Sequence, residues 1–494
     1  MNTKAELFKN AFYATAFQLA PRFANVVLFI LLGRLSGSSV AGVFALATTY
    51  LLISTTIMRG LDDLVVRQVS KEPERAFTYL VNFSLIRIAL SVVLYGILVI
   101  IVYLGFNYSE VTTRAILILG LSLLPDSLAF VAQSVLLGLR RFQGSAITVS
   151  AVSLVKLIGG VTIVLGGGSI EQIAWLWVLA SIVGMIIHWL LVLANIERRK
   201  LLGFVDTAFL KSSLRIAALF FVITALATLE TQMDTIILSG YRGEEEVAWF
   251  GAATTVAFSL ILLSQAYRFS VYPYMSRYVQ ETGEKLTQLY DNSIQLLAAL
   301  IFPMVFGIII IAPQIVPFIF GDDYFATIQV LQILILALIF IFLNEPNIRM
   351  MLVHDRQKWI AVILIAAVTT NILLNLVLAR YWGAVGSAAA RVSSAVLFFT
   401  LTSIYVGKYL TQPNLPSLIY KPLIASAVMT LILIPIREWF WPLLIVIGAV
   451  LYLIVLRLIG GFPPIRWRDL FSQMAGPSKD NVQTEAINNT QRFP

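Results

Sequence analysis

The chain has 494 residues, of which 59% are hydrophobic and only 12% are charged, and its mean hydropathy is +0.88. Soluble chains carry about 25% charged residues, so this composition excludes a protein that hides its apolar surface in one soluble core. It predicts a protein that lies in a lipid bilayer. The sequence contains no Cys, which excludes disulfides, thiolate metal sites and thiol catalysis.

Apolar runs recur along the whole chain. Lys4 and Lys9 precede the first run, which is long enough to span a bilayer and lacks a small-residue cleavage site, so we expect it to be retained as an anchor. About fourteen such runs are predicted, near 11–33, 40–60, 77–104, 113–138, 144–165, 171–195, 213–240, 247–272, 289–312, 325–351, 358–379, 385–407, 417–436 and 439–460.

The connections between the runs are short, and a backbone that crosses lipid must satisfy its own hydrogen bonds. The runs are therefore predicted to be helices rather than strands. The predicted fold class is an all-α integral membrane protein with about 14 transmembrane helices, without room for a soluble catalytic domain. The polar tail after residue 465 lacks periodicity and is predicted to be disordered.

Basic residues predict the orientation of these helices. With a cytoplasmic N-terminus, the inner connections collect most of the Lys and Arg residues, including the Arg198-Arg199-Lys200 run, and the outer ones keep few. We therefore expect both termini to be cytoplasmic. Because topology explains most of the net charge of +9, no nucleic-acid partner is predicted.

A sequence repeat suggests that the chain is duplicated. Residues 31–50 (LLGRLSGSSVAGVFALATTY) align without a gap with residues 237–256 (ILSGYRGEEEVAWFGAATTV). Both copies place a Gly-containing turn, Gly37 or Gly243, between two apolar helices and end in Ala-Thr-Thr followed by one more residue. Repeats in an apolar chain are typical of transporter halves that rock about a central site.

Short motifs in both halves carry a family resemblance. They are Arg34-Leu35-Ser36-Gly37 with Gly42-Val43-Phe44, Gly60-Leu61-Asp62, Val65-Val66-Arg67, Asp234-Thr235-Ile236-Ile237-Leu238 leading to Ala252-Ala253, Phe320-Gly321-Asp322-Asp323-Tyr324, and Asn371 through Asn375 to Gly383-Ala384-Val385-Gly386. In this order the motifs resemble bacterial and archaeal polysaccharide transporters, the O-antigen flippase-like branch of the multidrug/oligosaccharidyl-lipid/polysaccharide (MOP) superfamily.

The resemblance implies two pseudo-symmetric six-helix bundles around a central cavity, with two C-terminal helices as an appendage. On this basis we expect an N-terminal lobe at 1–200 and a C-terminal lobe at 201–412. Helices thirteen and fourteen would occupy 413–465, and the cytoplasmic tail would occupy 466–494.

Charged residues inside the apolar spans are candidates for the functional site, because each costs about 2.5 to 3.5 kcal/mol at a helix centre unless it faces protein or water. In the first half, Arg22, Arg87 and Lys156 lie near mid-span, and polar residues at helical spacing, such as Gln18 and Asn25, form stripes with them. These stripes predict a basic, substrate-binding cavity. The alternative is that the cations pair with buried carboxylates such as Asp126.

The second half mixes both signs of charge. Arg391 lies on another polar stripe and is predicted to face the same cavity. Glu230 and Asp234 stand one helical turn apart, where repulsion between two carboxylates favours protonation or a bound cation, so the pair is a candidate ion-coupling site. The alternative is a salt bridge with Arg391 or Arg268. The Asn344-Glu345-Pro346-Asn347 segment is expected to break the tenth helix.

These features lead to a functional hypothesis. We expect a flippase that moves an anionic lipid-linked oligosaccharide, a polysaccharide precursor, from the cytoplasmic to the outer leaflet of the cell membrane by alternating access. Its partners would be this substrate, membrane lipid and other polysaccharide assembly proteins. The alternatives are efflux of amphiphilic cations and an integral-membrane glycosyltransferase or polymerase. No acid/base constellation, phosphate loop or metal motif occurs in the sequence, so no enzyme activity, catalytic residue, cofactor or metal is predicted.

Overall fold

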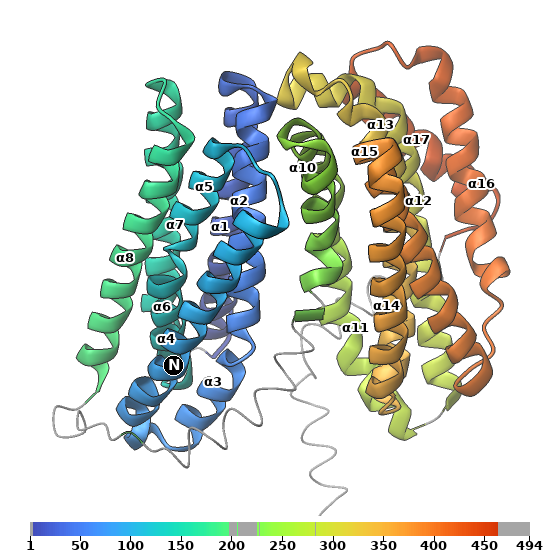
Figure 1. Ribbon diagram of the computed structural model, residues 1–494. Coiled ribbons are helices and arrows are strands. Elements are labelled where there is room, and N and C mark those ends of the chain that lie inside the picture. The colour runs from blue at the N-terminus through green and yellow to red at the C-terminus, as the bar shows by residue number, and fades with distance from the viewer. Residues whose placement is uncertain (1–2, 197–204, 206–224, 227, 282, 463–494) are drawn as a thin grey trace, which may run out of the picture. The chain divides into compact units, whose positions relative to one another are not determined.

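The structure is a computed structural model that describes residues 3–196, 205, 225–226, 228–281 and 283–462. This part of the chain is almost entirely helical and contains no strand (Figure 1). The chain divides into two compact units. The first comprises Met1–Leu263, Ile311–Ile341 and Gln357–Thr402, and the second comprises Ser264–Ile310, Phe342–Arg356 and Ser403–Pro494.

The helices of the first half belong to the first unit. They are α1 (Thr3–Ser36), α2 (Ser38–Arg59), α3 (Asp62–Lys71), α4 (Ala76–Ile100), α5 (Glu110–Gly120), α6 (Leu123–Gly138), α7 (Phe142–Leu165) and α8 (Ile170–Asn195), with short helical turns η1 (Pro73–Arg75) and η2 (Ile101–Gly105). Helix α1 packs on α7 and α2, α6 packs on α8 and α4, and α2 packs on α5 and on α10 of the second half.

The remaining helices lie in the second half of the chain. They are α10 (Glu244–Ser259), α11 (Ile261–Glu281), α12 (Gly283–Phe320), α13 (Thr327–Leu334), α14 (Ala337–Val353), α15 (Gln357–Tyr409), α16 (Leu415–Leu433) and α17 (Trp441–Leu458), with the turns η4 (Asp322–Tyr324) and η5 (Ile434–Ile436). Residues 228–242 are helical as well.

The predicted membrane spans are confirmed where the structure describes them. Twelve helical segments of the described residues are long and apolar enough to cross a membrane. One of them, Gln357–Tyr409, contains two of the predicted spans. The non-helical backbone at Gly383 divides it into these two spans. Most of the predicted seventh span and the tail from residue 466 lie outside the described residues, and the predicted lobe boundaries stay a prediction.

Two spans are broken in the same way. The fourth span is divided at Leu121 and Ser122, and the tenth at Ile335 and Leu336. At each break an amide bonds the carbonyl three residues earlier, as from Ser122 to Leu119 (3.0 Å) and from Leu336 to Ile333 (3.1 Å), so backbone polar groups stay satisfied within lipid. The two spans are six apart, which is the spacing expected of a duplicated six-helix unit.

The expected break at Pro346 is wrong. Helix α14 continues through this proline to Val353. Side-chain hydrogen bonds hold the segment: Tyr290 donates to Asn347 (2.6 Å), and Asn347 donates to Ser403 (2.9 Å). These bonds fix the Asn347 side chain beside the proline, and membrane helices tolerate proline where neighbouring groups satisfy the freed backbone carbonyl.

The repeated glycine turns share one backbone conformation. Gly37 and Gly243 have φ of 91° and 80°, a region that favours glycine, and each immediately precedes a helix, α2 or α10. These two helices pack so closely that a Cβ atom at Gly42 would overlap the carbonyl oxygen of Glu244. The contact therefore requires glycine at position 42.

We predict that Gly42→Ala lowers the thermal unfolding temperature of the purified protein, because the added methyl group must push α2 away from α10 at a cost of about 1 to 3 kcal/mol. The matched control is Gly96→Ala in α4, where a Cβ atom would meet nothing within 4 Å. Equal unfolding temperatures for the two variants would contradict the close contact.

Candidate functional site

A buried ionic cluster lies in the first unit around Asp234, whose side chain is fully buried. Arg391 donates to Asp234 Oδ2 from Nε (2.6 Å) and from a second guanidinium nitrogen. Asn375 donates to the other carboxylate oxygen (2.5 Å) and accepts a hydrogen bond from Ser387 (2.8 Å). One carboxylate thus joins the seventh, eleventh and twelfth predicted spans.

Glu230 joins this cluster more loosely. Its Oε1 lies 3.7 Å from a guanidinium nitrogen of Arg391, and its side chain is 31% exposed. The two predicted ion-coupling carboxylates therefore share one guanidinium. Of the two interpretations of the sequence, the salt bridge with Arg391 is the arrangement found in the structure.

Arg87 is paired in a comparable way. Its side chain is completely buried in α4 and forms an ion pair with Asp62, in the first turn of α3. Arg59 lies 3.9 Å from the same carboxylate. Structural pairing, the alternative raised for this cation, describes Arg87 in this structure, and its partner is Asp62 rather than Asp126.

Arg22 and Asn25 are exposed on α1. Arg22 lies fourteen residues before the end of α1 at Ser36, which is about 21 Å along the helix axis at 1.5 Å per residue. That depth falls inside a hydrocarbon layer about 30 Å thick. Gln18 belongs to the same helix, but its side chain lies outside the described part of the structure.

Lys156 lies on α7, the main neighbour of α1. Its ammonium group is 5.4 Å from the ring of Trp177 and 3.3 Å from the hydroxyl of Ser181. The two helices touch where a Cβ atom at Gly160 would come within 2.9 Å of Leu28. Lys156 comes four residues before Gly160, and Arg22 six before Leu28, so the two cations lie at similar depth in helices that cross the membrane in the same direction.

Neither cation is neutralised directly. Among the described residues, no carboxylate forms an ion pair with Arg22 or Lys156, although Asp126 acts on the Lys156 charge from a greater distance. The structure thus brings Arg391, Glu230 and Asp234 together and pairs Arg87 with Asp62. Of the four predicted cations, Arg22 and Lys156 are the two without an ion-pair partner among the described residues.

A second ionic cluster, in the second unit, was not predicted as a site. Glu345 accepts from Arg268 (2.7 Å) and Arg349 (3.2 Å), and the Arg349 guanidinium lies 5.7 Å from the ring centre of Tyr272. Two guanidinium groups share one carboxylate, so one positive charge is left. The four-residue spacing of Glu345 and Arg349 signals their pairing, whereas the contact with Arg268 spans 77 residues.

The described residues contain no group of three or more His, Asp or Glu side chains arranged to hold a metal ion. His188 is buried and bonds the carbonyl of Gly184 (2.8 Å) and the hydroxyl of Ser145 (3.3 Å). These contacts suit a structural role in packing α8 against α7.

Comparison with known families identifies the group to which this fold belongs. A family model described as "Polysaccharide biosynthesis protein" matches residues 31–329, more than half of the chain. The chain belongs to this family. A curated relative, the probable low-salt glycan biosynthesis flippase Agl15 of Haloferax volcanii, is 25% identical over 191 residues, which are 36% of this chain and 38% of the relative. The match thus spans well under half of that relative.

Solved structures establish the fold of this family member. The lipid II flippase MurJ in an inward closed conformation superposes with a TM-score of 0.75 at 16% identity, over 93% of this chain and 100% of that one. A multidrug resistance transporter of the MATE family, inward-facing, gives 0.64 at 14% identity, over 80% and 94%. A MOP superfamily transporter from Pyrococcus furiosus gives 0.53 at 15% identity, over 80% and 93%. The predicted MOP-type, multi-pass membrane fold is confirmed.

We predict that Arg391→Gln lowers the free energy of unfolding by about 3 to 5 kcal/mol, because it leaves the buried Asp234 carboxylate without its cation. The double variant Asp234→Asn/Arg391→Gln should recover part of this loss, since the fully buried carboxylate is gone and only the partly exposed Glu230 loses its partner. Thermal unfolding of the purified proteins measures both effects.

The control for these unfolding measurements is Arg380→Gln, which removes an exposed arginine and should leave stability unchanged. If the loss of unfolding free energy in the double variant equals the sum of the losses in Asp234→Asn and Arg391→Gln, the ion pair contributes nothing to stability.

Proposed function

We propose that this protein moves an anionic lipid-linked oligosaccharide from the cytoplasmic to the outer leaflet of the cell membrane by alternating access. Membership of a polysaccharide biosynthesis family and a MOP-type fold support this function. The excess of Lys and Arg in alternate connections supports cytoplasmic termini. Further partners would be other polysaccharide assembly proteins.

One observation carries the proposal: two cations on the packed pair α1 and α7 lie at membrane depth without a carboxylate partner in the described residues. A cation at the centre of a span costs about 2.5 to 3.5 kcal/mol unless water or an anion faces it. Arg22 and Lys156 would recover this energy when a phosphate or an acidic sugar binds beside them. Arginine can bind phosphate through two hydrogen bonds, whereas lysine supplies a point charge.

The same cations disfavour efflux of amphiphilic cations, the other transport function considered. A positively charged substrate would be repelled by Arg22 and Lys156, and no carboxylate of the described residues forms an ion pair with either of them. The sign of the unpaired charge therefore favours an anionic substrate.

We predict that Arg22→Gln and Lys156→Gln each slow transport about tenfold or more with near-normal protein abundance, because each removes one charge-assisted contact worth about 1.5 to 3 kcal/mol. Transport is measured in proteoliposomes as the appearance of a fluorescent polyprenyl-pyrophosphate-linked oligosaccharide in the opposite leaflet.

Two comparisons make this experiment decisive. Arg67→Gln removes an exposed arginine of α3 and should transport like the wild type. Arg87→Gln breaks the buried pair with Asp62 and should mainly reduce protein abundance. Normal transport by the Arg22 and Lys156 variants, or faster movement of a cationic dye than of the oligosaccharide, would overturn the proposed substrate class.

The same proposal assigns ion coupling to Glu230. Asp234 is fully buried, and both of its carboxylate oxygens already accept hydrogen bonds. Glu230 is partly exposed and only 3.7 Å from Arg391, so it is the carboxylate of the cluster that can exchange a proton or a cation with water. A bound proton can then stabilise one arrangement of the lobes more than the other.

We predict that Glu230→Gln transports the substrate with little dependence on an imposed proton or sodium gradient, whereas Asp234→Asn mainly lowers stability. Transport into vesicles is measured with and without each gradient. Glu245→Gln, an exposed carboxylate in the first turn of α10, is the control and should keep the wild-type response. An unchanged response in Glu230→Gln would remove the coupling role and leave the pair with Arg391 as a structural contact.

A further inference from the structure

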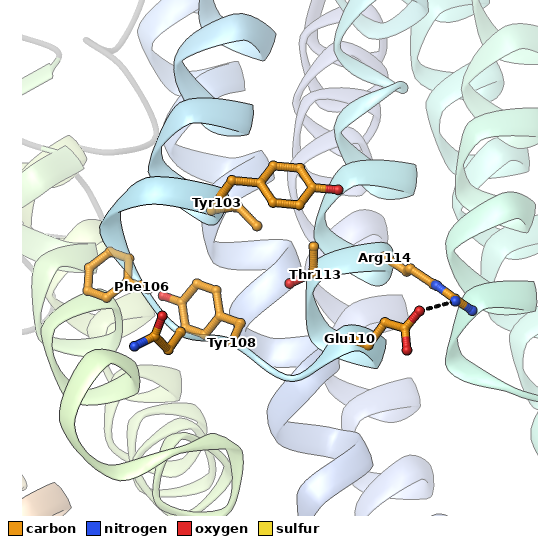
Figure 2. A pocket seen from close by; sticks show the side chains of 8 residues that line it. Tyr103, Phe106, Tyr108, Glu110, Thr113 and Arg114 are labelled. Carbon is orange, nitrogen blue, oxygen red and sulfur yellow. Dashed lines mark hydrogen bonds and ion pairs between the residues drawn. The ribbon is translucent and has the colours of Figure 1, made fainter.

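A hollow of about 430 Å³ lies where the chain passes from η2 into α5 (Figure 2). Aromatic rings and polar groups share its wall. The lining residues are Val102, Tyr103, Phe106, Asn107, Tyr108, Glu110, Thr113 and Arg114. None of them belongs to the ionic clusters or to the α1 and α7 pair described above.

The hollow adjoins a contact between the two halves of the chain within the first unit. The Tyr108 hydroxyl shares hydrogen bonds with the hydroxyls of Tyr50 on α2 (3.0 Å) and Ser239 (2.8 Å). The connection that carries Tyr108 follows the third predicted span, and the Gly37 and Gly243 turns follow the first and the seventh spans. Successive spans alternate in direction, so these connections lie on one side of the membrane, which the proposed orientation makes the outer side.

The aromatic groups of the hollow offer flat apolar surface. The rings of Phe106 and Tyr108 are stacked, with centroids 5.3 Å apart and an interplanar angle of 23°. Tyr103 is 63% exposed, a large aromatic side chain with an uncovered face. Pyranose rings present C–H faces that pack on aromatic rings, while their hydroxyl groups need donors and acceptors of the kind that Asn107 and Thr113 supply.

The charges around the hollow restrict the kind of sugar. Arg114 forms an ion pair with Glu110, drawn as a dashed line in Figure 2, and its guanidinium lies 3.6 Å from Glu171. Two carboxylates around one guanidinium leave one negative charge. An acidic sugar or a phosphate would be repelled here, in contrast to the unpaired cations of α1 and α7.

We propose that this hollow binds an uncharged pyranose unit of a saccharide on the outer side of the membrane. The inference rests on the proposed transport function and adds a second saccharide contact, separate from the cationic one. A sugar seated here touches Tyr108, which bonds Tyr50 and Ser239. Binding is thereby connected to the contact between the two halves of the chain.

The test is direct binding to the full-length protein in nanodiscs, followed by saturation-transfer NMR. The probes are cellotetraose, a neutral saccharide, and tetragalacturonic acid, an acidic one. We expect saturable binding of cellotetraose and at least fivefold weaker binding of the acid. Tyr103→Ala should weaken cellotetraose binding about fivefold, since an aromatic contact contributes on the order of 1 kcal/mol.

The matched control is Tyr381→Ala, another exposed tyrosine that does not line the hollow. It should bind cellotetraose like the wild type, and all variants should share one unfolding temperature. Absence of saturable binding, equal weakening in both variants, or preference for the acid would overturn the inference. Loss of binding with intact transport refutes only the hollow, whereas binding without transport of the lipid-linked substrate refutes only the proposed transport function.

Discussion

The cost of charge within a bilayer is the constraint on which this structure depends. A membrane helix can keep a charged side chain only if protein, water or a ligand compensates it. Arg87, Arg391 and Glu345 satisfy the requirement with buried ion pairs. Arg22 and Lys156 do not pair with any carboxylate of the described residues. Charges that pair with a carboxylate hold helices together, and the two cations without such a partner indicate where an external anion can bind.

The two halves of the chain use charge differently although they share the glycine turns and the broken fourth and tenth spans. In the second half, Asp234 links Asn375 and Arg391, so a single carboxylate connects three predicted spans. A buried pair of this kind is costly to break and gives the surrounding helices one fixed arrangement. In the first half, Arg22 and Lys156, which have no ion-pair partner among the described residues, lie on the packed helices α1 and α7. Such a division suits a transporter in which rigid helix groups move about a charged binding region.

Local features of this protein are predictable from its sequence, and long-range pairings are not. Apolar length predicts the described spans, and the Gly37 and Gly243 turns follow from the repeat. The pairing of Arg87 with Asp62 was missed, because the aspartate begins a short amphipathic helix after Gly60-Leu61 and resembles an ordinary loop charge in the sequence. The expected break at Pro346 was wrong, because the helix continues through the proline, and the adjacent Asn347 bonds the distant side chains of Tyr290 and Ser403. Which charges stay unpaired depends on contacts between helices, and no local pattern records them.

The geometry of the Arg391 cluster also limits how much an ion gradient can contribute. Two adjacent carboxylates suggest a strong preference for a bound cation, but the Arg391 guanidinium already compensates Asp234. The remaining interaction, between Arg391 and a Glu230 that is 31% exposed, has a distance of 3.7 Å. Two unit charges about 4 Å apart near a protein surface attract each other by at most about 4 kcal/mol before their desolvation is subtracted. Reversing a 1:99 population of two states requires about 5.5 kcal/mol of differential binding. Protonation of Glu230 alone can therefore bias the alternation of the lobes without driving it, and binding of the anionic substrate at Arg22 and Lys156 has to supply most of the difference.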